Sequence, residues 1–187
     1  MAGLRARLKK TIVLVGMMGA GKTAVGKALA ARLAVPFLDS DQEIVKAASA
    51  TIAEIFVRDG EAFFRDRETE VITRLLNAKA GVLSTGGGAY LAAHNRQLIS
   101  DAGVAVWLQA DLDLLWQRVR HKGSRPLLRT ANPRETLAGL YKTRDPLYAL
   151  ADLRVSCHAD YSIDDMAAAV LEVLKSRRDV LEISRDG

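Results

Sequence analysis

Short apolar runs alternate with longer amphipathic stretches along this chain, and this alternation is typical of an α/β protein. Five of the runs are rich in aliphatic residues and lack the polar alternation of a half-exposed strand. They predict strands at residues 11–15, 36–39, 81–85, 104–108 and 153–156. Strands of this kind belong to a parallel sheet that helices cover on both faces.

Apolar residues at helical spacing predict helices at residues 22–34, 41–49, 51–57, 61–78, 91–100, 111–121, 134–149 and 163–177. Thr51 and Glu54 are spaced as a capping box, and Pro146 should interrupt the seventh helix. The order of elements predicts a three-layer α/β/α fold with a five-stranded parallel sheet. Because no linker or repeat divides the chain, we expect a single domain over residues 1–187 with a loosely ordered tail at 178–187.

The segment 16–23, Gly-Met-Met-Gly-Ala-Gly-Lys-Thr, has the spacing of a phosphate-binding loop between a predicted strand and a predicted helix. Its glycines let backbone N–H groups approach phosphate oxygens, and the helix N-terminus adds positive potential. Lys22 is suited to the β- and γ-phosphates, and the Thr23 hydroxyl to Mg²⁺. The alternative is a glycine-rich turn that binds nothing. Such a turn would not require a strand before it and a helix after it, so their presence favours the phosphate-binding loop.

Two aspartates follow the second predicted strand, and ligands of parallel sheets bind beyond the carboxyl ends of the strands. Asp39 can hold Mg²⁺ directly or through water. Asp41 can orient an acceptor hydroxyl or take its proton. The alternative is that one of them caps the next helix, and capping is compatible with either function.

Three consecutive glycines, Gly86, Gly87 and Gly88, follow the third predicted strand. They cost backbone entropy and add no packing, so they suit a backbone that approaches a ligand closely. A loose turn is the alternative. At this edge of the sheet we favour the binding role.

Two arginines stand in local contexts suited to an anion. Arginine binds a carboxylate through two parallel hydrogen bonds, so Arg65 and Arg144 are candidates for orienting a small acid. The alternatives are ordinary ion pairs, of Arg65 with Glu68 or Glu61 and of Arg144 with a neighbouring acid.

A polar, proline-containing break at residues 122–133 is predicted to form a lid. Arg125 within it could close over the phosphates and stabilise the charge in transfer. Closure would also exclude water, which would otherwise hydrolyse ATP. An ordinary exposed loop is the alternative.

Composition narrows the class of protein. Hydrophobic residues make up 49% of the chain and charged residues 26%, as in globular proteins, and no apolar run approaches the roughly 20 residues that cross a bilayer. The net charge of +5 comes from basic residues spread along the chain, so we expect small anions and no nucleic acid as partners.

The single Cys157 excludes an intrachain disulfide. The apolar run after the basic start is too short for a signal peptide, which favours the cytoplasm.

Six segments in order from Val13 to about Tyr148 resemble the motifs of the shikimate kinase family. They are Gly-Met-Met-Gly-Ala-Gly-Lys-Thr, Leu-Asp-Ser-Asp, Asp-Gly-Glu-Ala-Phe-Phe-Arg, Thr-Gly-Gly-Gly-Ala, Arg-Pro-Leu-Leu and Arg-Asp-Pro-Leu-Tyr. The resemblance implies a P-loop, nucleoside-monophosphate-kinase-like fold. It implies transfer of the γ-phosphate of ATP to the 3-hydroxyl of shikimate, a step towards chorismate and the aromatic amino acids. It also implies Mg²⁺ as cofactor, ATP and shikimate as partners, no membrane partner, and a cytoplasmic monomer.

The same resemblance assigns roles to individual residues. It implies that the catalytic residues are Lys22, Asp41 and Arg125. It implies that the adenine of ATP is contacted by Arg120, with His121 as the alternative. The ATP-binding residues that it implies are Gly19, Ala20, Gly21, Lys22, Thr23, Ala24, Arg120 and Arg125. Within substrate-binding helices at about 41–78 and beyond, it implies that shikimate is bound by Asp41, Arg65, Gly87, Gly88 and Arg144, with Phe56 and Phe64 as apolar walls. The metal is implied to contact Thr23 and, through water, Asp39.

Two departures and two rivals accompany this hypothesis. Ala24 stands where many relatives have a second hydroxyl, and residues 159–161 match the family's adenine contacts poorly. A gluconate kinase would share the phosphate-binding loop but is not expected to combine Arg65 with the three glycines. A GTPase switch would carry an Asn-Lys-x-Asp motif, which this chain lacks.

Overall fold

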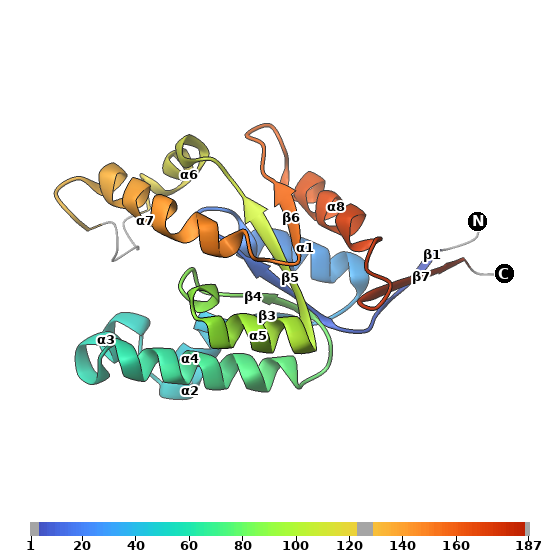
Figure 1. Ribbon diagram of the computed structural model, residues 1–187, viewed down its shortest axis with the longest axis horizontal. Coiled ribbons are helices and arrows are strands. Elements are labelled where there is room, and N and C mark those ends of the chain that lie inside the picture. The colour runs from blue at the N-terminus through green and yellow to red at the C-terminus, as the bar shows by residue number, and fades with distance from the viewer. Residues whose placement is uncertain (1–3, 123–128, 186–187) are drawn as a thin grey trace.

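Five parallel strands form the central sheet of the computed structural model, which describes residues 4–122 and 129–185 (Figure 1). Their spatial order is β3-β4-β2-β5-β6. The strands are β2 (Thr11–Val15), β3 (Phe37–Asp39), β4 (Val82–Ser84), β5 (Gly103–Gln109) and β6 (Leu153–Ser156). Every residue of β2 and β4 is buried, as expected for strands covered on both faces. The predicted five-stranded parallel sheet is therefore confirmed.

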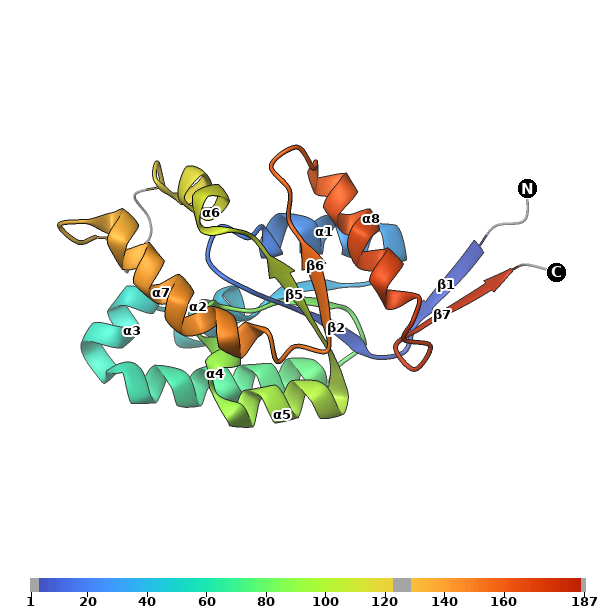
Figure 2. The same cartoon turned by 45° about the horizontal axis from the view of Figure 1, so that its top comes forward.

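Helices lie on both faces of this sheet (Figure 2). α1 and α8 pack together on one face, while α4 and α5 lie on the other. In the described part of the chain, none of the helices is both long and apolar enough to cross a membrane. Their bounds are α1 (Lys22–Leu33), α2 (Ser40–Ala48), α3 (Ile52–Asp59), α4 (Glu61–Leu76), the short 3₁₀ helix η1 (Ala89–Leu91), α5 (Ala93–Ala102), α6 (Leu112–Val119), α7 (Pro133–Tyr148) and α8 (Ile163–Leu174).

The chain changes direction across the sheet between the neighbouring strands β2 and β4. From β2 it passes through α1 to β3 at one edge, whereas from β4 it passes through α5 to β5 on the other side of β2. Neighbouring parallel strands whose connections diverge leave a crevice at their carboxyl ends. The loops that follow β2 and β4 therefore border the same crevice.

Local sequence signals account for several of the helix ends. The predicted capping box is present, with the Thr51 hydroxyl accepting from the Glu54 N–H and the Glu54 carboxylate accepting from the Thr51 N–H. The predicted break near Pro146 is wrong, because α7 continues through that residue to Tyr148. Pro146 lies in the last turn, where one missing N–H costs a single hydrogen bond and the following turn closes normally at Ala149.

The two ends of the described chain pair with each other. β1 (Leu4–Leu8) and β7 (Leu181–Arg185) form an antiparallel two-stranded sheet beside the main sheet (Figure 2). The prediction of a loosely ordered tail is therefore wrong over β7. The ribbon is anchored by Leu181, which is 2% exposed, and by an ion pair of 3.2 Å between Lys9 and Glu182. Its two strands stand at opposite ends of the sequence, so no local pattern could reveal the pairing.

Leu29 tests how firmly α1, and with it the phosphate-binding loop, is held on the sheet. Its side chain is 0% exposed. Because truncation leaves a cavity in a close-packed core, we expect Leu29→Ala to lower the free energy of unfolding by about 2–5 kcal/mol in urea denaturation. Leu29→Met preserves volume and should cost less than about 1.5 kcal/mol. Equal losses in the two variants would contradict this account of the helix–sheet contact.

Candidate active site

Three glycines in the left-handed region shape the loop between β2 and α1. Gly16, Gly19 and Gly21 have φ angles of 145°, 84° and 94°, which other residues rarely adopt. The loop brings the chain directly to the N-terminus of α1 at Lys22. N–H groups at a helix N-terminus lack intrahelical partners and carry partial positive charge. The loop is therefore built to hold an anion.

The Lys22 side chain folds back over this loop. Its Nζ donates hydrogen bonds to the carbonyl oxygens of Gly16 and Met17, at 2.7 Å and 3.0 Å. The ammonium charge is thus held at the loop itself, on a flexible stem that can follow a phosphate group.

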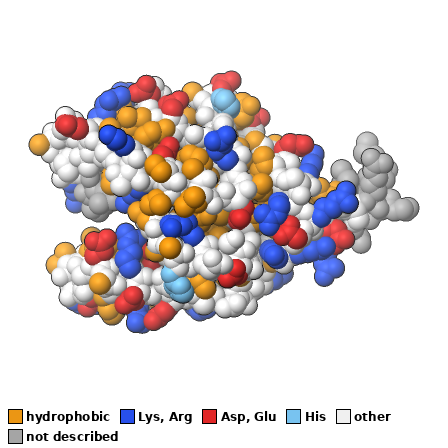
Figure 3. Space-filling model, in the orientation of Figure 1, with side chains coloured by type: hydrophobic (Ala, Val, Ile, Leu, Met, Phe, Trp, Pro, Cys, Tyr) orange, Lys and Arg blue, Asp and Glu red, His pale blue; other side chains and the backbone are white. Residues whose placement is uncertain are grey.

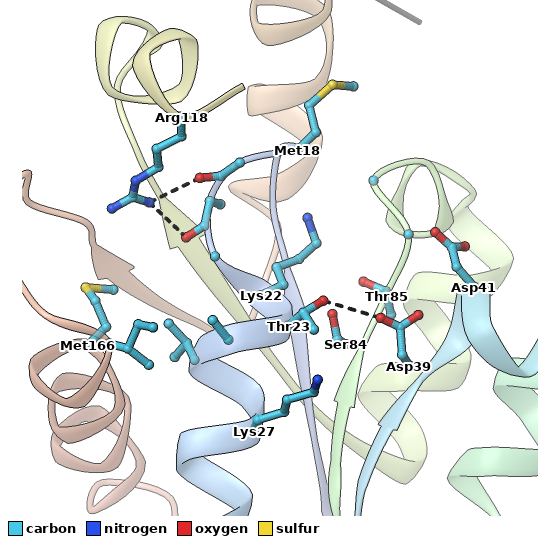
Figure 4. Close-up of a pocket in the computed structure, with 18 of the residues that line it drawn as sticks. Met18, Lys22, Thr23, Lys27, Asp39, Asp41, Ser84, Thr85, Arg118 and Met166 are labelled. Atoms are coloured by element: carbon cyan, nitrogen blue, oxygen red, sulfur yellow. Dashed lines mark hydrogen bonds between the residues drawn. The ribbon is translucent and has the colours of Figure 1, made fainter. Parts of the chain in front are cut away.

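A cavity of about 630 Å³ extends from the loop across the crevice (Figure 4). On the surface, the molecule is hollowed between α7 and the α3–α4 pair, with Lys and Arg side chains beside the hollow (Figure 3). The cavity joins the phosphate-binding loop to the ends of β3 and β4 and to the start of α8. It is lined by residues 18–25, Lys27, Asp39, Asp41, residues 84–87, Arg118, Lys122, residues 161–163 and Met166.

Thr23 and Asp39 face each other across the crevice (Figure 4). Thr23 Oγ1 donates to Asp39 Oδ2 at 3.3 Å. The other carboxylate oxygen of Asp39 accepts from the backbone N–H of Gln42 at 3.1 Å and caps α2. Capping, which the sequence left compatible with a functional role, occurs together with the contact to Thr23 because the cap uses only one oxygen.

Asp41 lies against the glycine loop that follows β4. A Cβ atom at Gly86 would come within 2.6 Å of Asp41 Oδ1, so a larger residue there would displace the carboxylate. Burial and the neighbouring Asp39 raise the pKa of Asp41, while Lys22 and Arg65 oppose the rise. The carboxyl group is therefore desolvated and stands between another acid and two cations.

Arg65 reaches the same glycine loop from α4. A Cβ atom at Gly88 would overlap the Arg65 guanidinium. Arg65 Nη1 donates to Glu68 Oε1 at 2.9 Å, and the Glu68 side chain is only 1% exposed. Burial raises the pKa of Glu68 and Arg65 opposes that rise. The sequence left two alternatives for Arg65, an ion pair within the helix and a place at the site. The structure shows both, since Arg65 pairs with Glu68 and also lies against Gly88.

Arg144 lies buried in the penultimate turn of α7, beside the middle glycine of the loop. It is 8% exposed, and a Cβ atom at Gly87 would lie 3.1 Å from its Nη1. Among the residues that the structure describes, no carboxylate forms an ion pair with Arg144. The charge of Arg144 opposes the rise in the pKa of Glu68, but no carboxylate of the described chain contacts the guanidinium directly. Because a buried cation without a direct ion pair is costly, this arrangement points to an anionic ligand.

Aromatic rings support the guanidinium of Arg65 on the α3–α4 side. The rings of Phe56 and Phe64 lie 4.7 Å apart between centroids. The guanidinium carbon of Arg65 lies 5.2 Å from the centroid of Phe64. These two residues, predicted as apolar walls, are thus close to one of the two cations.

Arg118 contacts the phosphate-binding loop, whereas Arg120 does not line the cavity. Arg118 Nη1 donates to the carbonyl oxygens of Gly19 and Ala20, at 3.1 Å and 3.4 Å. Arg120 follows the last residue of α6 and is exposed. Residues two positions apart on a helix do not face the same way, so only one of these arginines can point to the loop. The predicted lid residue Arg125 lies outside the described residues.

Sequence reasoning missed several residues of the site. Spacing had indicated Glu68 as a partner of Arg65, but its burial, at 1% exposure, depends on packing. No signal in the sequence pointed to Arg118 at the phosphate-binding loop. The end of the cavity at residues 161–163 and Met166 follows a segment whose resemblance to the family is poor.

A loop carrying lysine and threonine after a central parallel strand, with aspartates facing it across a crevice, defines the class of P-loop kinases. Within this class, the shikimate kinase family profile matches residues 18–175. Shikimate kinase of Cereibacter sphaeroides is 63% identical over 177 residues, which cover 95% of this chain and 88% of that protein. Shikimate kinase of Ruegeria pomeroyi is 63% identical over 182 residues, which cover 97% of this chain and 93% of that protein. The chain belongs to the shikimate kinase family, as its motifs predicted.

Solved structures support the same assignment. Shikimate kinase from Acinetobacter baumannii in complex with shikimate is 43% identical and gives a TM-score of 0.85, covering 90% of this chain and 94% of that chain. A gluconokinase from Sinorhizobium meliloti is 17% identical and gives a TM-score of 0.60, covering 91% of this chain and 94% of that chain. This likeness extends to the fold alone. The P-loop, nucleoside-monophosphate-kinase-like fold is confirmed.

The raised pKa of Asp41 predicts that its charge destabilises the folded protein. The cost is absent below the ordinary carboxyl pKa of about 3.9, where folded and unfolded chains are both protonated. It grows as the pH rises, because the unfolded chain ionises first, and it is complete above the folded pKa. We therefore expect Asp41→Asn to unfold with a larger free energy than wild type at neutral pH, with the difference shrinking towards pH 4.

Urea denaturation of both proteins between about pH 4 and pH 7 measures this effect. The exposed Asp66 on α4 offers a matched control, since Asp66→Asn removes the same charge without burial. A variant at Asp41 that gains no more than the Asp66 control at any pH would contradict the account of a desolvated carboxylate.

Proposed function

We propose that this protein transfers the γ-phosphate of ATP to the 3-hydroxyl of shikimate, in the pathway to chorismate and the aromatic amino acids. One observation carries the proposal: Gly86 and Gly87 line the same cavity as the phosphate-binding loop, and two guanidinium groups lie against Gly87 and Gly88. Three consecutive glycines contact Asp41, Arg144 and Arg65 in turn. A ring acid seated on these glycines could present its carboxylate to the arginines and a hydroxyl to Asp41.

ATP is proposed to lie along the cavity with its phosphates on the loop. The backbone at Gly19, Ala20 and Gly21 and the N-terminus of α1 at Lys22, Thr23 and Ala24 would receive the phosphate oxygens. Lys22 would exchange its loop carbonyl partners for the β- and γ-phosphates. We assign the base contact to Arg118 in place of Arg120, because Arg118 lines the cavity.

Thr23 and Asp39 fit a magnesium site. They bring a hydroxyl and a carboxylate oxygen within 3.3 Å of each other, and both are hard oxygen ligands of the kind Mg²⁺ prefers. Thr23 would hold the ion directly and Asp39 through water. When bound with ATP, Mg²⁺ neutralises charge on the phosphates.

Asp41 is proposed to position the acceptor hydroxyl. Its carboxylate would accept a hydrogen bond from the 3-hydroxyl and direct that oxygen at the γ-phosphorus, and it can take the proton during transfer. A raised pKa makes a carboxylate a better proton acceptor at neutral pH.

Arg65 and Arg144 are proposed to bind the shikimate carboxylate, with Gly87 and Gly88 leaving room for the ring. We further propose that Arg125, in the lid at 122–133, closes over the phosphates, on the strength of the Arg-Pro-Leu-Leu motif. A cytoplasmic monomer that binds no nucleic acid stays a prediction.

A coupled assay of ADP release with ATP, Mg²⁺ and a panel of hydroxy acids tests the function, with Lys22→Ala as the catalytic variant. Turnover should depend on shikimate. Lys22→Ala should lower kcat by at least about 10²–10³-fold, because it removes a charge aimed at the transferring phosphoryl group. Equal turnover of gluconate and shikimate by the wild-type protein would contradict the proposal.

Arg144→Ala should mainly weaken acid binding. Losing the charged hydrogen bonds of one arginine should raise KM for shikimate by about 10–100-fold and leave KM for ATP nearly unchanged. Arg144→Lys keeps the charge but loses the paired hydrogen bonds to a carboxylate. Its KM for shikimate should therefore fall between those of wild type and Arg144→Ala. If steady-state kinetics give Arg144→Ala an unchanged KM for shikimate, the assignment of this residue is wrong.

A further inference from the structure

Tyr148, the last residue of α7, places a polar group beside the glycine loop that follows β4. Its side chain is 0% exposed, and its ring lies 6.4 Å from that of Trp107 on β5. The phenol oxygen donates a hydrogen bond of 2.5 Å to the carbonyl oxygen of Gly87. A fully buried ring is thereby fixed at its polar end by the glycine loop.

The Arg144 guanidinium lies beside the same phenol oxygen. Its positive charge opposes the effect of burial, which raises the pKa of Tyr148 to about 12. Both groups lie within 4 Å of the Cβ position of Gly87, Nη1 of Arg144 at 3.1 Å and Oη of Tyr148 at 3.7 Å. The phenol, the guanidinium and the glycine loop thus meet at one point.

The donors and acceptors at this point allow one arrangement. A guanidinium can only donate, whereas a neutral phenol has one proton and two lone pairs. Because the Gly87 carbonyl takes the phenol proton, the lone pairs stay available to a guanidinium N–H.

We propose that Tyr148 is a positioning residue that holds the Arg144 guanidinium in the orientation that receives the substrate carboxylate. The inference rests on the proposed function and adds a residue to which no role had been given. It explains how a buried arginine stays ordered although no carboxylate pairs with it in the described part of the chain.

The two arginines of the site are held by partners of different charge. Arg65 is held by the carboxylate of Glu68, while Arg144 is held by a neutral phenol. A neutral acceptor fixes the guanidinium without cancelling its charge, so its attraction remains available to the carboxylate of the ligand. Ordering the side chain before binding also removes an entropy cost from the binding step.

Tyr148→Phe tests the proposal, because it keeps the ring against Trp107 and removes only the hydroxyl. We expect KM and the calorimetric Kd for shikimate to rise by about 10-fold, as for the loss of one hydrogen bond to a charged group. We expect kcat to change by less than about 3-fold and KM for ATP to stay constant. Tyr141→Phe is the matched control, since it removes a phenol of the same helix that pairs with Asp145 and should leave these constants unchanged.

The methyl ester of shikimate separates positioning from a general structural role. Wild type should discriminate strongly between shikimate and this uncharged ester. Tyr148→Phe should lose much of that discrimination, because only the carboxylate uses Arg144. A variant that binds shikimate as wild type does, or that loses affinity for acid and ester alike, would overturn the proposal.

A measurement on the wild-type protein keeps the test valid if Tyr148→Phe does not fold. In ¹H–¹⁵N NMR spectra of the ligand-free protein, an ordered Arg144 should give a sharp Nε–H signal that is missing from Arg144→Lys. Absence of this signal from wild type would overturn the proposal. If wild type itself neither binds nor phosphorylates shikimate, the proposed function fails, an outcome distinct from failure of the role of Tyr148.

Discussion

The close approach of charged side chains to a backbone without Cβ atoms is the constraint on which the site depends. The glycine loop after β4 lies at the point where the sheet connections diverge. Asp41, Arg144 and Arg65 each contact one glycine of this loop. A Cβ atom at Gly86 or Gly88 would overlap a charged group, and one at Gly87 would crowd Arg144. The loop is therefore the surface against which the charges of the site are placed.

Asp41 and Arg144 share a second feature, which is that the charge of each is only partly balanced by neighbouring groups. Asp41 is desolvated beside another acid, and burial raises its pKa. Arg144 is buried without a carboxylate partner in the described part of the chain. Such groups cost free energy in the folded protein. They are retained beside the crevice, where a ligand can supply the missing partners, and strained charges of this kind are typical of binding sites.

Several residues serve local structure and the site together. Asp39 caps α2 with one oxygen and meets Thr23 with the other. Arg65 forms a helical ion pair with Glu68 and still reaches Gly88. In both cases one side chain has a role in local structure and a place at the site. They coincide because helix N-termini and strand ends of an α/β sheet meet at the edge where ligands bind.

Local pattern was sufficient for the five strands, the loop before α1, the capping box at Thr51 and the family to which the chain belongs. Apolar runs, glycine spacing and ordered motifs act over a few residues, so the sequence alone determines them. The pairing of β1 with β7, the contact of Arg118 with the phosphate-binding loop, and the hydrogen bond from Tyr148 to Gly87 depended on the tertiary structure. Each of these joins residues far apart in the chain, or selects one face of a helix. Only the packed sheet decides which distant groups share a crevice.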